Sequence, residues 1–130
     1  VYGAWTLAVP DVFSIRHTTV EAYLEPVVHE IKVSRADLLG DLKRPEKRAA
    51  YLAMASQVYY VLGCNVKGQP IAEADEVPAA CGVMVAAGTR LEMVRVAPKQ
   101  PFTGLRFDVW MALAKAAPLQ RDHAEGQGLL

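Results

Sequence analysis

The stretch VVHEIKV at residues 27–33 predicts a β-strand, because β-branched residues dominate it. Side chains alternate between the two faces of a strand. One face carries His29, Ile31 and Val33, and the opposite face carries Glu30 and Lys32. The more apolar set should face the core, which makes His29 a hydrogen-bonded core histidine.

Working outward, the β-branched and aromatic run at 58–62, which ends at Gly63, predicts a second buried strand parallel to the first. The segment between them predicts two helices that form a broken crossover. Ser34 is a good N-cap for a helix through residues 36–42. Pro45 suits the first turn of a second helix that carries residues 49–54.

The remaining elements complete an α/β domain. Short strands are expected at 5–9 and 12–15, and a hairpin is expected from 83–86 and 91–96. A helix is expected over 105–117. From Pro118 the chain becomes polar and rich in glycine, so we expect one domain at 1–118 and a flexible tail at 119–130.

The composition is that of an ordinary folded domain. The chain has 130 residues, 52% apolar and 22% charged, which is enough for one folded domain. Its formal net charge is zero, yet residues 32–48 hold six Lys or Arg against three Asp or Glu. Cys64 and Cys81 form no ligand motif, so a reducing, cytoplasmic setting is expected. The apolar runs are too short to span a membrane.

Two carboxylates and a lysine suggest phosphodiester chemistry. If Asp11, which follows Pro10, lies near Glu30, the two carboxylates and the Ile31 carbonyl can hold Mg²⁺ or Mn²⁺. Lys32 would then help to activate a water molecule. A surface ion pair within the 30–32 segment and an ordinary turn at 10–11 are the alternative interpretation.

The order of these elements resembles the PD-(D/E)XK restriction-endonuclease-like superfamily, and within it the MmcB-like proteins associated with bacterial DNA repair. The likeness runs from Asp11 to about Val96. It lies in Glu30-Ile31-Lys32, Ser34, Asp37, Asp41, Lys43, Pro45, Arg48, Tyr59-Tyr60, Val77-Pro78 and residues 82–86. The resemblance implies a restriction-endonuclease-like central mixed β-sheet flanked by helices. It also implies Asp11 and Glu30 as metal ligands, Lys32 as the catalytic lysine, and DNA as the partner.

The sequence departs from that superfamily in two places. An acidic residue on a helix before the first strand often completes the metal site there, and this chain begins too late to show one. Some of these nucleases carry Gln-x-x-x-Tyr after the lysine strand, whereas this chain has Lys47-x-x-x-Tyr51. Lys47 and Tyr51 share a helical face. A phosphate contact by Lys47 remains open, but a solvated lysine beside a core tyrosine is favoured.

Five basic side chains are candidates to follow a DNA backbone, namely Arg35, Lys43, Arg44, Lys47 and Arg48. The equal alternative is that they serve solubility and are neutralised by Asp37 and Asp41. The hydroxyls of Ser34 and Tyr51 lie near the proposed site but have no triad around them, and the role of His17 stays open.

The leading hypothesis is therefore a metal-dependent DNA nuclease or DNA-processing domain in repair. The alternatives are a nuclease-like DNA-binding or protein-interaction module without turnover, and an unrelated small-molecule-binding domain. A repair-protein partner and a homo-oligomer are both left open by the sequence.

Overall fold

A five-stranded mixed sheet forms the centre of the computed structural model, which describes residues 9–102 and 104–116. Its strands lie in chain order: β1 (Val12–Ser14), β2 (Val27–Lys32), β3 (Gln57–Leu62), β4 (Gly82–Ala87) and β5 (Arg90–Arg95). The β2–β3 and β3–β4 pairs are parallel, and the outer pairs are antiparallel. This confirms the α/β class, the parallel pairing of the two predicted strands and the later hairpin.

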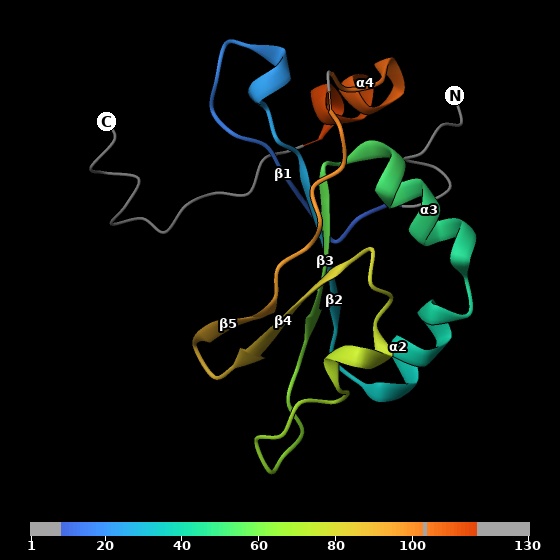
Figure 1. Ribbon diagram of the computed structural model, residues 1–130, viewed down its shortest axis with the longest axis vertical. Helices are drawn as coiled ribbons and strands as arrows, with labels where there is room; N and C mark the ends of the chain where they lie inside the picture. Colours follow the sequence, from blue (N-terminus) through green and yellow to red (C-terminus); the bar gives the residue numbers. More distant parts are fainter. Residues whose placement is uncertain (1–8, 103, 117–130) are drawn as a thin grey trace.

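Helices α2 (Arg35–Leu42) and α3 (Pro45–Met54) connect β2 to β3 and cover one face of the sheet (Figure 1). Helix α4 (Phe107–Lys115) lies at one end of the sheet, beside the segment that contains the short helix η1 (Glu21–Tyr23). The indole Nε1 of Trp110 donates to the Glu21 carboxylate at 3.2 Å and joins these two segments. A second short helix, η2 (Ala74–Glu76), precedes β4.

The starts of α2 and α3 follow the predicted signals. The Ser34 side chain accepts a hydrogen bond from the Asp37 backbone N–H at 3.1 Å, which satisfies one of the unpaired donors of the first turn. Pro45 opens α3, where its missing N–H costs nothing. Both helix starts confirm the prediction. The predicted strand at 5–9 falls mainly on residues 1–8, and the tail at 119–130 lies wholly outside the described residues.

The assignment of the two faces of β2 was wrong. Val28, Glu30 and Lys32 face the helices and are buried, whereas Ile31 is 44% exposed and Val33, just beyond the strand, is 72% exposed. The helix-covered side of the sheet contains the apolar core around Leu38, Tyr51 and Tyr60. The charged pair therefore lies at the edge of that core, because β2 presents Val28 to it and must place every second residue on the same face.

His29 lies on the opposite face from the one that α2 and α3 cover. Its ring stacks on Tyr59 with 5.7 Å between centroids, and its buried Nδ1 has no hydrogen-bond partner among the described residues. Partial burial lowers the pKa of His29. The expected hydrogen-bonded core histidine is thus incorrect in two respects, since His29 is only partly buried and Nδ1 is unpaired.

Arg95 fastens the segment before β4 to the edge strand β5. Its guanidinium donates to the carbonyl oxygens of Ala74, Val77, Pro78 and Cys81 at 2.8–3.2 Å. A planar group with five donors can make several such contacts at once. The loop that carries η2 is therefore tied to β5 by one side chain. Among the described residues, no helix has the length and apolar character needed to cross a membrane.

Gly82 occupies a position where a side chain does not fit. A Cβ at this residue would overlap the Tyr59 ring and lie 2.6 Å from the Ala97 backbone nitrogen. We expect Gly82→Ala to lower the free energy of unfolding by about 1–3 kcal/mol through overpacking. Gly40→Ala is the matched control, because a Cβ there has no neighbour within 4 Å. It should stabilise α2 by about 0.5–1 kcal/mol. Urea unfolding of both variants measures this, and equal stabilities would contradict the packing described.

Candidate functional site

Asp11 and Glu30 meet as the sequence predicts. Asp11 directly precedes β1, which pairs antiparallel with β2, so the two residues become neighbours. The Asp11 backbone N–H donates to Oε1 of Glu30 at 3.3 Å. In return, Oδ2 of Asp11 accepts a hydrogen bond from the Ile31 backbone N–H at 2.8 Å. The exposed carboxylate of Asp11 is thus anchored beside the buried carboxylate of Glu30.

Four charged side chains form an ion cluster, which we define as Glu30, Lys32, Asp41 and Lys47; the first three are buried and Lys47 is partly exposed. The Lys32 ammonium lies 3.6 Å from Glu30 and 3.5 Å from Asp41. The Lys47 ammonium lies closer, 2.9 Å from Glu30 and 3.1 Å from Asp41. Two positive and two negative charges balance within the cluster, as burial away from water demands.

Helices α2 and α3 supply the half of the cluster that the strand lacks. Burial favours the neutral forms of both Asp41 and Lys47, which would raise the pKa of the first and lower that of the second. The Tyr60 hydroxyl and the two ammoniums outweigh burial at Asp41 and hold its pKa below the ordinary value. Glu30 and Asp41 likewise raise the pKa of Lys47. Both groups are therefore charged at neutral pH.

Two core tyrosines lie beside the ion cluster. The Tyr60 hydroxyl donates to Oδ2 of Asp41 at 2.5 Å, and the Tyr51 hydroxyl donates to the Val9 carbonyl at 3.1 Å. Burial, followed by the nearby carboxylates, raises the pKa of both phenols. They therefore remain neutral hydrogen-bond donors at neutral pH. The prediction that Tyr51 is a core residue is confirmed, since it is fully buried.

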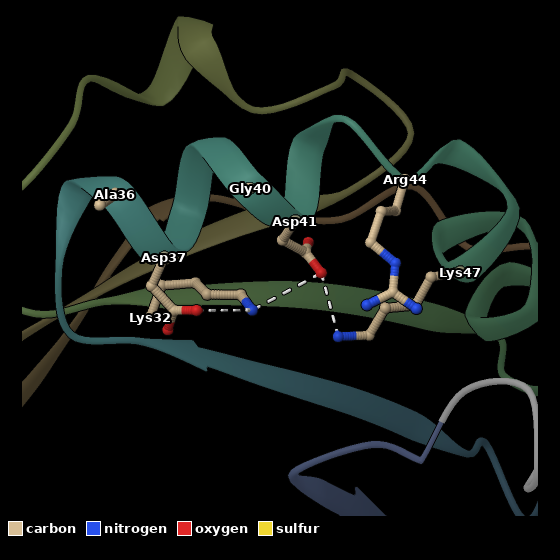
Figure 2. Close-up of a pocket in the computed structure, with 7 residues that line it drawn as sticks. All are labelled: Lys32, Ala36, Asp37, Gly40, Asp41, Arg44 and Lys47. Carbon is tan, nitrogen blue, oxygen red and sulfur yellow. Dashed lines mark ion pairs between the residues drawn. The ribbon is translucent and has the colours of Figure 1, made fainter.

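A pocket of about 320 Å³ opens onto the cluster from the side of α2 (Figure 2). Lys32 lies at its base, and Asp37 and Arg44 stand at its rim, both more than half exposed. Figure 2 shows the ammoniums of Lys32 and Lys47 directed from two sides toward the carboxylate of Asp41. The remaining lining residues are Ala36 and Gly40, whose small size leaves the helix surface open.

The five predicted DNA-contacting residues occupy different environments. Arg35 forms an ion pair with Glu76 at 2.6 Å and donates to the Ile71 carbonyl, so it fastens the η2 loop to α2. Lys47 belongs to the ion cluster, which contradicts the expectation of a solvated lysine. Arg48 is partly buried, with Nη1 lacking a hydrogen-bond partner in the described residues. Lys43 and Arg44 remain exposed near the pocket.

Sequence reasoning missed the roles of Asp41 and Tyr60. Asp41 was treated as a neutraliser of surface charge, yet it is 6% exposed and bonds a core tyrosine. A signal was present: Leu38 and Asp41 are three apart, which puts them on one face of α2. A carboxylate on the buried face of a short helix requires a partner in the core, and Tyr60 on β3 provides it.

Acid should weaken the fold through Asp41. Because its pKa is lowered in the folded state, its ion pairs contribute stability above the ordinary value of 3.8, which is lost as the pH falls through the folded value. Asp41→Asn should cost about 3–5 kcal/mol near neutral pH and make stability less dependent on acid pH. Asp75→Asn, at an exposed position, should change neither quantity. Denaturant unfolding over a pH series measures this; equal acid dependence in Asp41→Asn and wild type would refute it.

No protein-family model and no curated protein matches the chain. Among solved structures, it is similar to the SPO1766 protein of unknown function from Silicibacter pomeroyi, with 27% sequence identity and a TM-score of 0.47. The similarity covers 70% of this chain and 53% of that one, so the chain matches about half the length of that protein.

Proposed function

We propose that this domain engages DNA and hydrolyses its phosphodiester bonds with the help of Mg²⁺ or Mn²⁺. The observation that supports this most directly is the meeting of Asp11, Glu30 and Lys32. Glu30 touches the Asp11 backbone through Oε1 and the Lys32 ammonium through Oε2. Glu30 thus links Asp11, which is distant in sequence, to Lys32, which lines the open pocket.

The oxygen donors present suit a cation of the magnesium type. Mg²⁺ is commonly held by one or two carboxylates together with waters and phosphate oxygens of the substrate. Asp11 and Glu30 would provide the carboxylates, and the Ile31 carbonyl would be a third oxygen ligand. No set of three or more His, Cys, Asp or Glu side chains in the described part of the chain is arranged for a metal. Substrate and water would therefore complete the coordination.

The residues around the cation would divide the chemistry between them. A bound divalent cation supplies a water of lowered pKa and polarises the phosphoryl oxygens. Lys32 lines the pocket, so its ammonium can offset negative charge that develops on those oxygens in the transition state. Glu30 and Asp41 hold this ammonium from two sides and fix its position. Asp11 is anchored by the Ile31 N–H, which orients its carboxylate without a further side chain.

Lys43 and Arg44 are the residues best placed to contact the DNA backbone. Both are exposed, and Arg44 stands at the rim of the pocket, where its ion pair among the described residues is a long 3.8 Å contact to Glu46. Contacts of this kind bind phosphates regardless of sequence. We assign no such role to Arg35 and Lys47, because carboxylates of the protein already engage them.

A nuclease-like module without turnover is the second candidate. The observation that favours it is the charge balance of the ion cluster, in which Lys32 and Lys47 neutralise Glu30 and Asp41 without any added cation. In that case DNA binding would persist without Mg²⁺, and no strand would be cut.

Asp11→Asn tests the hydrolytic proposal. The amide oxygen still accepts the Ile31 N–H, so the fold is kept while the negative charge is lost. We expect cleavage of plasmid, single-stranded and branched DNA in Mg²⁺ to fall by about a hundredfold or more. Glu92→Gln, an exposed carboxylate on β5, is the control and should cut like wild type. Absence of Mg²⁺-dependent cleavage by wild type, or equal cleavage by Asp11→Asn, removes this function.

Salt dependence tests the DNA-contact assignment. Replacing Lys43 and Arg44 together by Gln should weaken DNA binding and reduce the slope of log affinity against log salt by about one to two. Arg90→Gln removes an exposed positive charge at the β4–β5 turn and should leave the slope unchanged. Fluorescence anisotropy with a labelled duplex measures both. A double variant that binds like wild type at every salt concentration would show that DNA is contacted elsewhere.

A further inference from the structure

The Lys47 ammonium occupies a position between two carboxylates that a metal cation could also take. It lies 2.9 Å from Oε2 of Glu30 and 3.1 Å from Oδ1 of Asp41. These oxygens come from β2 and α2, and both side chains are at least 96% buried. The Lys47 ammonium thus bridges two buried acids that belong to different elements of the fold, as the Lys32 ammonium does at longer range.

Oδ1 of Asp41 provides a second, independent observation. It is buried and makes no hydrogen bond of acceptable geometry in the described structure, although Oδ2 of the same carboxylate has the Tyr60 hydroxyl. Its only close polar contacts given by the structure are ionic, to Lys47 at 3.1 Å and to Lys32 at 3.5 Å. A buried carboxylate oxygen held this way retains the capacity to bind a cation directly.

We propose that Lys47 is a tethered counter-ion, which a divalent cation must displace in order to bind Glu30 and Asp41. This inference rests on the proposed function, because it concerns the cation that the hydrolysis requires. It makes Asp41, supplied by α2, a direct carboxylate ligand beside Glu30. Asp11 would then act on the cation through a bound water, because the described residues contain no set of three acidic side chains arranged for a metal. Lys47 becomes the residue that sets the cation affinity of the site.

The surroundings of Lys47 allow such an exchange. Its side chain is 18% exposed and lines the pocket of about 320 Å³, so the ammonium has accessible space next to its present position. The displaced ammonium can therefore move into the open pocket, while Asp37 keeps its 3.9 Å contact with the Lys32 ammonium. The four-carbon stem of lysine is flexible enough to change partners without movement of α3. Lys32 stays in place and keeps its contact with Glu30.

Removal of the Lys47 charge has two expected effects. Glu30 and Asp41 lose their nearest counter-ion, so the cation-free fold becomes less stable. The same loss removes the competitor, so a divalent cation binds more tightly. A lysine that served packing alone would produce the first effect without the second.

The experiment compares Mn²⁺ binding to the full chain for wild type and Lys47→Gln, by calorimetry and by electron paramagnetic resonance. We expect Lys47→Gln to bind Mn²⁺ at least about tenfold more tightly than wild type. Its melting temperature should be lower than that of wild type in chelator and should rise more on addition of Mn²⁺. Lys67→Gln, in the exposed loop after β3, is the matched control and should behave as wild type. Equal affinities of wild type and Lys47→Gln would overturn the proposal.

A second measurement uses wild-type protein and needs no variant. Reductive methylation followed by mass spectrometry reports which lysine ammoniums are accessible. Lys47 should be protected without Mn²⁺ and become reactive when Mn²⁺ is added, whereas Lys67 should react in both conditions. Protection of Lys47 that no Mn²⁺ concentration relieves would overturn the exchange.

The failure of this inference can be distinguished from failure of the proposed function. Tighter Mn²⁺ binding by Lys47→Gln without DNA cleavage by either protein would support the counter-ion role and remove the nuclease activity. Mg²⁺-dependent cleavage by wild type together with equal Mn²⁺ affinities would keep the nuclease and remove the counter-ion role.

Discussion

The burial of three charged side chains between the sheet and the helices, with the partly exposed Lys47 beside them, is the constraint on which the rest of this structure depends. Glu30 and Lys32 cannot leave the covered face of β2 without also turning Val28 outward. Once they are inside, each charge requires a partner at close range, since an unpaired buried charge costs several kcal/mol. Asp41 and Lys47 meet that requirement, and in doing so they fix where α2 and α3 sit over the strand. Helix position and site chemistry therefore have the same cause.

Much of the fold could be predicted because local signals agreed with one another. The β-branched runs at 27–33 and 58–62, joined by a crossover with a Ser34 cap and Pro45, are typical of a parallel strand pair. The orientation of β2 could not be predicted in the same way. A period of two identifies which residues share a face, but not which face is covered. Apolar Ile31 and Val33 suggest that their own face of β2 is covered. In the folded chain the opposite face is covered, because Glu30 and Lys32 find charged partners there.

The candidate site, too, could be predicted from the sequence only in part. Proximity of Asp11 and Glu30 could be inferred from the resemblance and the order of strands, because neighbouring antiparallel strands bring such residues together. The contribution of Lys47 and Asp41 depends on how two helices pack, and helix packing has no short sequence signature. The sequence shows Lys47 as a departure from an expected glutamine and as a candidate DNA contact, with a solvated position favoured. In the structure its ammonium instead lies between two buried carboxylates.

The hydrogen bonds made by Arg95 affect the local unfolding of this domain. One guanidinium on the edge strand β5 bonds four carbonyl oxygens between Ala74 and Cys81. Fraying of the edge strand must release that loop, and release of the loop must leave the guanidinium without its acceptors. The two segments therefore open together as one cooperative unit of local unfolding. The same loop holds Glu76 against Arg35 at the start of α2, so such an opening would also break this ion pair and disturb the helix that lines the pocket.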